Sequence, residues 1–305
     1  MKIAILGAGG VGAYVGARLQ EAGEDVAFIA RGAHLAALRA DGLQLRAPFG
    51  DLHLRTVRAT DDPADIGEVE LVVFAVKLWD TQTAAAAMAP LLGPQTRVLT
   101  LQNGIDSAAL IARQEPRARV VAGAIYLSAY IDRPGVIVSP GGFHRIVADA
   151  AGGDPVVAAF CAACARAHAL EATASATGTR AIWEKFVALS AVSGATALLR
   201  APTGPILGHP ETRAFLQQLL AEGVMVAAAA GHELPAGFAD AALAGIAAMP
   251  PNFRASMAED LDRGRRLELA WLSGRMHGLG REHHVPTPAH SAVYRGLLLH
   301  AQGRG

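Results

Sequence analysis

The sequence predicts an α/β domain with a parallel sheet, followed by an all-helical domain. In the first half of the 305-residue chain, short apolar runs that read as strands alternate with helix-like segments. This alternation favours a parallel sheet covered by helices on both faces. From about residue 177 to the end, helical periodicity and a high Ala and Leu content dominate. We therefore predict two domains, 1–174 and 175–305.

The residue pattern assigns individual elements in order. The expected strands are Lys2–Gly7, Asp25–Ala30, Leu43–Arg46, Leu52–Arg58, Val69–Lys77, Thr96–Gly104 and, as the last one, Glu171–Ser175. Helices are expected at Val11–Ala22 and His34–Ala40 in the first domain. Turn signals such as "APTGP", "GHELPAG" and "HHVPTP" separate the helices of the second domain.

Composition and hydropathy argue against a nucleic-acid-binding protein and against a membrane protein. Basic and acidic residues both total 27, and no basic stripe is interleaved with aromatic residues. This argues against a nucleic-acid partner. The N-terminus enters a strand without a signal-peptide pattern, and no apolar run reaches the roughly 18 residues of a membrane span. We expect a soluble cytoplasmic protein without a membrane partner.

The only two cysteines, Cys161 and Cys164, precede His168 in a C-x2-C-x3-H arrangement. This spacing fits a metal or redox pair. However, the segment reads as an Ala-rich helix, no fourth ligand lies nearby in the sequence, and a buried cysteine behaves as a small hydrophobic residue. We interpret both as packing residues and expect no metal; a redox role stays open.

The stretch "ILGAGGVG" places Gly7, Gly9 and Gly12 in G-x-G-x-x-G spacing. A strand is expected before it and a helix directly after it, which is the context of a dinucleotide-binding Rossmann-type domain. There, the first Gly permits a tight turn, the second lets the pyrophosphate approach the backbone, and the third lets helix and strand pack closely.

Polar residues at three strand ends refine this prediction. An NAD-binding domain would place an acid after the second strand, but this chain has Arg31. A guanidinium suits a 2′-phosphate, so NADPH is the expected cofactor, although Arg31 can also be a solvated surface residue. Lys77 and Asn103 end two further strands, where open α/β sheets bind ligands.

In the second domain, Lys185 stands in a largely apolar helix-like stretch, and Glu268 lies among Leu267, Leu269 and Trp271. An unpaired buried charge is very costly. Pairing Lys185 with Glu268 would explain both positions; alternatively, each side chain reaches solvent separately. Ser256 precedes the turn that leads to Glu268.

Together these motifs resemble the ketopantoate reductases (2-dehydropantoate 2-reductases) over essentially the whole chain. The resemblance rests on the order and spacing of "GAGGVG", "VKLWDT" around Lys77, "LQNG" around Asn103, "WEKF" around Lys185, "SMAEDLDRGRRLELAWLSG" from Ser256 through Glu268, and "VPTPAHSAVY" from Val285.

The resemblance implies a helical domain like the C-terminal one of 6-phosphogluconate dehydrogenase. It also implies NADPH-dependent reduction of ketopantoate to pantoate, a step of pantothenate biosynthesis. In the family, the lysine matching Lys185 is the general acid and the acid matching Glu268 pairs with it. The residue matching Ser256 binds the substrate's carboxylate end. Those matching Lys77 and Asn103 line the cofactor and active site. A homodimer is compatible with this family.

The chain departs from the family pattern beside the general acid. The family commonly has Asn four and eight residues after this lysine, whereas this chain has Leu189 and Ser193. Ser193 is the candidate substrate contact that remains. Losing a partner for a substrate hydroxyl costs discrimination. A less polar 2-oxo acid or another carbonyl substrate is therefore the first alternative, and a non-catalytic NADP(H)-binding sensor is the second.

Overall fold

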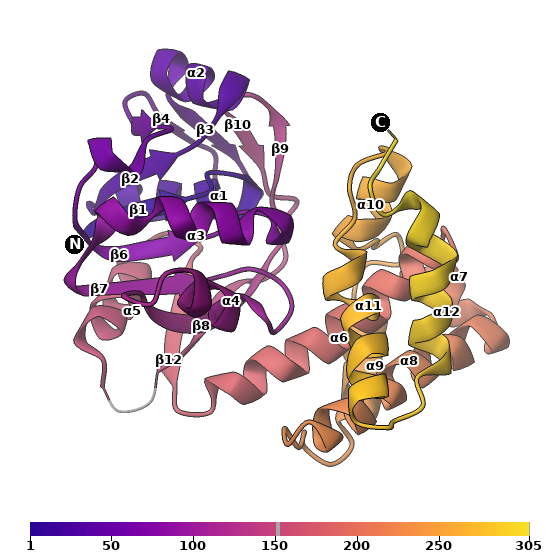
Figure 1. Ribbon diagram of the computed structural model, residues 1–305. Coiled ribbons are helices and arrows are strands. Elements are labelled where there is room, and N and C mark those ends of the chain that lie inside the picture. The colour runs from indigo at the N-terminus through magenta and orange to yellow at the C-terminus, as the bar shows by residue number, and fades with distance from the viewer. Residues whose placement is uncertain (151–152, 305) are drawn as a thin grey trace. The chain divides into compact units, whose positions relative to one another are not determined.

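The computed structural model describes residues 1–150 and 153–304, which fall into two compact units (Figure 1). The first comprises Met1–Gln102 and Asp106–Thr179. The second comprises Asn103–Ile105 and the chain from Arg180 onward. The main break follows strand β12 (Glu171–Ser175), because β12 pairs with β11 (His144–Asp149) and so stays with the sheet.

The first unit is built on an eight-stranded sheet with the order β12-β11-β8-β7-β6-β1-β2-β5. Its remaining strands are β1 (Lys2–Leu6), β2 (Asp25–Ile29), β5 (Arg58–Thr60), β6 (Val69–Phe74), β7 (Leu92–Thr100) and β8 (Arg119–Leu127). From β8 to β5 all neighbours pair in parallel, and β11 runs antiparallel to β8. The parallel part has the strand order of a doubly wound dinucleotide-binding sheet. The predicted Rossmann-type fold is thus confirmed.

A smaller sheet has the order β4-β3-β10-β9 and contains β3 (Leu43–Arg46), β4 (Leu52–Leu54), β9 (Tyr130–Arg133) and β10 (Val136–Val138). The prediction of one strand over Leu52–Arg58 was wrong. Residues 52–54 pair with β3, whereas residues 58–60 pair with β2 in the large sheet. The exposed Arg55 and Thr56 carry the chain from one sheet to the other.

Helices cover both faces of the large sheet. They are α1 (Gly10–Glu21), α2 (Gly32–Asp41), α3 (Thr81–Ala87), α4 (Ser107–Gln114) and α5 (Pro155–Arg166), with short 3-10 turns η1 (Pro63–Asp65), η2 (Leu78–Asp80) and η3 (Ala89–Leu91). Alternate residues of β1 point to opposite faces. Accordingly Ile3 and Ile5 join one core with α1 and α5, while Ala4 and Leu6 join a second core with α3 and α4.

The cysteine pair lies on α5. Cys164 is fully buried in the core shared with α1, and Cys161 packs against that core. Burial raises the pKa of both thiols, which disfavours the thiolate that metal binding and redox exchange require. Within residues 1–150 and 153–304, no three His, Cys, Asp or Glu residues are grouped so as to hold a metal ion.

The described part of the second unit is all-helical, as predicted. Its elements are α6 (Gly178–Leu198), α7 (Thr203–Gly208), α8 (Pro210–Ala229), α9 (Phe238–Ala247), α10 (Ser256–Asp262), η4 (Leu269–Trp271), α11 (Ser273–Glu282), α12 (Pro288–Leu297) and η5 (Leu298–His300). Phe186, Leu219, Met276 and Val293 are central to their shared core. Among the described helices, none has the length and apolar character needed to cross a membrane.

A buried carboxylate begins α12. Thr287, at the N-cap position, makes no side-chain capping bond. Glu222 of α8 is only 2% exposed, and its two oxygens accept hydrogen bonds from the backbone N–H groups of Ala289 (2.8 Å) and His290 (2.9 Å). Two amides that would otherwise lack a partner are thereby satisfied, and the negative charge suits the helix N-terminus.

We expect Glu222→Gln to lower the free energy of unfolding by about 1–3 kcal/mol, because a carboxamide offers one acceptor oxygen where two amides need one each. Urea unfolding followed by circular dichroism measures the effect. Glu211→Gln, at the exposed start of the same helix, is the matched control. Equal losses for the two variants would contradict the capping role.

Candidate functional site

The Gly-rich turn joins β1 to α1, and its glycines are required by different contacts. Gly7 has φ +100°, and a Cβ there would lie 2.7 Å from the Val76 nitrogen. A Cβ at Gly12 would overlap the Gly7 carbonyl oxygen, so helix and strand pack closely only without it. A Cβ at Gly9, in contrast, would meet nothing within 4 Å. Backbone is therefore accessible at Gly9, as a bound phosphate requires.

Gly10, a further glycine of this turn, was missed by the sequence reasoning. A Cβ at Gly10 would overlap the Ala129 carbonyl group, because the segment that leads into β9 crosses the start of α1. The signal in the sequence is the additional glycine in "GAGG". Its requirement comes from a contact with a segment more than a hundred residues away, so a local motif could not reveal it.

The other predicted cofactor residues lie at the carboxyl ends of neighbouring strands. Arg31 follows β2, is exposed and occupies the N-cap position of α2. Lys77 follows β6, is exposed, and its Nζ lies 5.6 Å from the centre of the Trp79 ring. Since β2, β1 and β6 are adjacent in the sheet, both cations flank the Gly-rich turn at the same edge. This donor set, together with the N-terminus of α1, fits the phosphates of a dinucleotide.

In the helical unit, three predicted residues form a hydrogen-bonded chain. Lys185 Nζ donates to Asn103 Oδ1 at 2.9 Å, and Asn103 Nδ2 donates to Glu268 Oε2 at 2.9 Å. The two neighbours fix the orientation of the carboxamide, because an ammonium can only donate and an ionised carboxylate can only accept. The expected pairing of Lys185 with Glu268 thus runs through the Asn103 amide.

The geometry of residues 103–105 explains this arrangement. Asn103 comes three residues after the end of β7 at Thr100, and Gly104 turns the chain with φ +82°. A Cβ at Gly104 would lie 3.2 Å from the carbonyl oxygen of Trp271, in the turn η4 that Glu268 precedes. Ile105 packs against the helical core. These three residues therefore belong to the helical unit, although the strand before them belongs to the sheet.

Burial and charge act on Lys185 in opposite directions. Desolvation lowers its pKa from 10.5 to about 8, and the Glu268 carboxylate opposes part of that decrease. Glu268 itself is only 7% exposed. At neutral pH the lysine is therefore still mostly protonated, but it releases its proton far more readily than an exposed lysine does.

The remaining predicted substrate residues make no hydrogen bond to this chain of three within the described residues. Ser256 is exposed at the start of α10. Ser193 is 1% exposed, and its hydroxyl lacks a hydrogen-bond partner among the described residues. Leu189, one turn after Lys185 on α6, is partly buried against the helical core. The positions four and eight residues after Lys185 on α6 thus carry one apolar side chain and one buried hydroxyl group.

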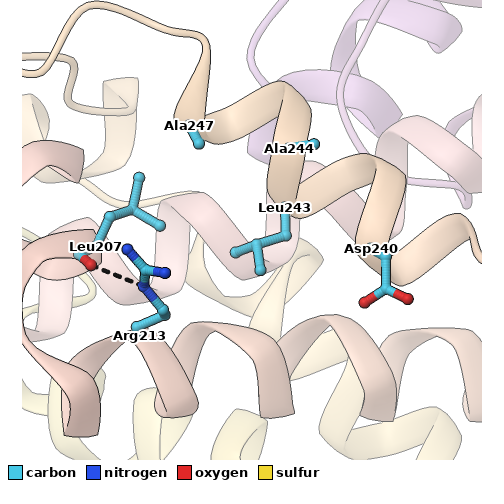
Figure 2. Close-up of a pocket in the computed structure, with 6 residues that line it drawn as sticks. All are labelled: Leu207, Arg213, Asp240, Leu243, Ala244 and Ala247. Atoms are coloured by element: carbon cyan, nitrogen blue, oxygen red, sulfur yellow. Dashed lines mark hydrogen bonds between the residues drawn. The ribbon is translucent and has the colours of Figure 1, made fainter.

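Two surface cavities contain none of these residues. A cavity of about 210 Å³ in the helical unit is lined by Leu207, Arg213, Asp240, Leu243, Ala244 and Ala247 (Figure 2). A second one, of about 460 Å³, lies in the first unit between the end of α2 and the β9–β10 hairpin. The candidate site is therefore defined by its hydrogen bonds and backbone contacts.

Comparison with known proteins gives consistent matches along the chain. The family models described as "Ketopantoate reductase PanE/ApbA" and "Ketopantoate reductase PanE/ApbA C terminal" match residues 3–153 and 179–301. A 2-dehydropantoate 2-reductase of Halobacterium salinarum is 32% identical over 294 residues, covering 94% of this chain and 95% of the relative. These matches confirm the resemblance.

Solved structures agree. The PanE/ApbA family ketopantoate reductase from Ralstonia eutropha superposes with a TM-score of 0.89 at 32% identity, covering 99% of this chain and 98% of the other. A D-mandelate dehydrogenase in ternary complex with NADH and anilino(oxo)acetate superposes with a TM-score of 0.88 at 20% identity, covering 99% and 98%. The latter match shows the fold alone.

The depressed pKa of Lys185 predicts a pH signature in stability. Between about pH 8 and pH 10.5 the unfolded chain holds a proton on this lysine that the folded chain has released, so folding becomes more favourable as the pH rises. Relative to Lys185→Met, we expect the wild type to gain roughly 3 kcal/mol across this interval. Urea titrations at several pH values measure the difference, and a pH-independent difference would contradict the shifted pKa.

Proposed function

Because the chain belongs to the ketopantoate reductase PanE/ApbA family, we propose that it is an NADPH-dependent 2-dehydropantoate 2-reductase. It would convert ketopantoate to pantoate for pantothenate biosynthesis, with residues 1–174 binding the cofactor and 175–305 supplying the catalytic groups. The observation that carries the proposal is the hydrogen-bonded chain Lys185–Asn103–Glu268.

Lys185 is the proposed general acid. NADPH, when bound, supplies the hydride that adds to the carbonyl carbon. Negative charge then develops on the carbonyl oxygen, and the Lys185 ammonium stabilises this charge and donates the proton that completes the hydroxyl group. A pKa near 8 keeps the ammonium populated at neutral pH while lowering the cost of proton transfer.

Asn103 and Glu268 prepare the acid for this step. Glu268 accepts from the Asn103 amide, which keeps Oδ1 directed at the ammonium and orients one of its N–H bonds. The remaining N–H bonds are then available to a substrate oxygen. The Glu268 charge also favours the protonated lysine. Ser256 and Ser193 are proposed substrate contacts, with Ser256 at the carboxylate end.

For the cofactor, we assign the phosphates to the Gly7–Gly12 turn and the 2′-phosphate to Arg31. Open space above Gly9 and the N-terminus of α1 support the first assignment. The exposed cation at the end of β2, where an NAD-binding domain would have an acid, supports the second. Lys77 adds a positive charge at the end of β6.

A second candidate keeps this chemistry and changes the substrate. Leu189 lies one helical turn from Lys185 and offers no hydrogen bond, and the Ser193 hydroxyl is buried. Both observations favour a 2-oxo acid with an apolar substituent in place of the hydroxylated chain of ketopantoate. If the protein binds NADPH but turns over no substrate, a non-catalytic NADP(H) sensor is indicated.

We also propose a homodimer, because a ketopantoate reductase from Staphylococcus aureus with the same fold is described as dimeric. Light scattering from the purified protein distinguishes monomer from dimer.

NADPH oxidation with a panel of 2-oxo acids tests the proposed function. We expect turnover with ketopantoate that exceeds turnover with unsubstituted, branched and aromatic 2-oxo acids, and a loss of at least about 100-fold in kcat for Lys185→Ala. A ranking led by branched apolar acids would support the second candidate. Tight NADPH binding without turnover on any member would refute both enzyme proposals.

Arg31→Ala tests the choice between NADPH and NADH. Removing a charge-assisted contact to the 2′-phosphate should weaken NADPH binding about 10- to 100-fold and leave NADH binding within about threefold. Cofactor fluorescence titration measures both affinities. Arg39→Ala, which removes another exposed guanidinium from α2, is the matched control. Equal effects on both cofactors would refute the 2′-phosphate assignment.

The pH dependence of kcat/KM tests the pairing of Glu268 with Lys185. Reduction needs the protonated lysine, so its rate should fall as the pH rises through about 8. Glu268→Gln keeps an acceptor for Asn103 but removes the charge that raises the Lys185 pKa. The falling limb should therefore move to lower pH. A limb that stays in place in this variant would argue against the electrostatic role.

A further inference from the structure

Gln102, the residue before Asn103, holds a buried network that the proposed mechanism does not use. Gln102 is only 9% exposed. Nε2 donates to the Val76 carbonyl oxygen (2.9 Å) and to Thr81 Oγ1 (2.9 Å), while Oε1 accepts from Thr100 Oγ1 (3.3 Å). The Thr81 hydroxyl in turn donates to the Leu78 carbonyl oxygen (2.7 Å).

This network occupies the carboxamide fully. Both of its N–H donors and its oxygen are engaged, and Thr81 is 1% exposed. Gln102 therefore has no donor left for a ligand. Its hydrogen bonds instead hold the loop of residues 76–81. One bond goes to Val76, directly before Lys77, and another to Thr81, which begins α3 and itself bonds to Leu78, directly after Lys77.

The same loop abuts the Gly-rich turn. The Val76 nitrogen is the atom that a Cβ on Gly7 would approach to 2.7 Å. Val76 is thus held at both ends of its backbone, with its nitrogen packed against Gly7 and its carbonyl oxygen bonded to the Gln102 amide. Lys77 follows it directly, with an exposed side chain and an extended backbone (φ −64°, ψ 147°) ahead of η2.

We propose that Gln102 is a positioning residue for dinucleotide binding. It fixes residues 76–81 at the edge of the Gly-rich turn, so that the Lys77 ammonium is presented to the cofactor phosphates without a cost for ordering the loop. Gln102 acts through Lys77 and does not touch the cofactor. This inference rests on the proposed function, in which Lys77 contacts NADPH.

The choice of glutamine is specific in this position. A glutamate of the same shape cannot donate to the Val76 carbonyl or to the Thr81 hydroxyl, and a methionine of similar length removes all three bonds. Thr81→Val removes the hydroxyl and keeps the volume, whereas Thr81→Ser keeps the hydroxyl. These variants separate the hydrogen bonds from packing.

A double-mutant cycle on NADPH affinity tests the proposal. We expect Gln102→Met and Lys77→Ala each to raise the Kd for NADPH about tenfold, measured by fluorescence titration of the protein without substrate. In the double variant the increase should stay near that of Lys77→Ala alone. Gln95→Met, an exposed glutamine on β7, is the matched control and should leave the Kd unchanged.

Several outcomes overturn the inference. Increases that multiply to about a hundredfold in the double variant would show that Gln102 acts independently of Lys77. An unchanged Kd for Gln102→Met would show that the loop needs no such support. If Gln102→Met does not fold, Thr81→Val takes its place in the cycle, and Thr81→Ser should restore the wild-type Kd.

Thermal unfolding without cofactor separates positioning from general stability, because a purely structural role lowers the Tm without coupling to Lys77. Failure of the proposed function gives a different result. A protein that binds NADPH but reduces no 2-oxo acid would refute the enzymatic proposal while the cycle still measures the coupling. A wild type that does not bind NADPH would overturn both.

Discussion

The candidate site of the helical unit depends on Lys185, whose ammonium group lies where desolvation disfavours its charge. Burial lowers the pKa of Lys185, and the charge of the Glu268 carboxylate opposes part of that decrease. The hydrogen bond of the ammonium goes to the uncharged Asn103 amide, which the same carboxylate holds. This hydrogen-bonded chain gives the Lys185 ammonium an acceptor that carries no charge, because the Asn103 amide lies between Lys185 and Glu268. The lysine is therefore protonated at neutral pH and yet acidic.

This chain of three constrains the backbone around it. Asn103 can reach Lys185 and Glu268 only if residues 103–105 leave the sheet and settle on the helical unit, which the positive φ of Gly104 permits. Gln102, one residue earlier, stays with the sheet and holds the loop of Lys77. Two consecutive side chains thus belong to two different hydrogen-bond networks, one in each unit.

In the first unit, the parallel sheet brings the predicted cofactor-binding residues together. Because all strands from β8 to β5 run in one direction, their carboxyl ends meet at one edge, and the turns after β1, β2 and β6 become neighbours. Glycine is needed at three positions of the turn after β1: Gly7 touches the turn after β6, Gly10 touches the segment before β9, and Gly12 packs on the Gly7 carbonyl, whereas Gly9 leaves room. Family membership and this geometry agree on a dinucleotide-binding oxidoreductase, and Leu189 places an apolar side chain four residues after Lys185 on α6.

The sequence by itself determined the class of the fold and the glycine turn, and it selected Lys185, Glu268 and Asn103 as candidate site residues, because each depends on local pattern or on the cost of a buried charge. It predicted a pair of Lys185 and Glu268, and only the tertiary structure placed an amide between them. The division of Leu52–Arg58 between two sheets, the need for Gly10, and the cap that Glu222 provides were also decided there. All of these depend on contacts between segments far apart in the chain, and residue spacing carries no information on which distant backbone atom will be the neighbour.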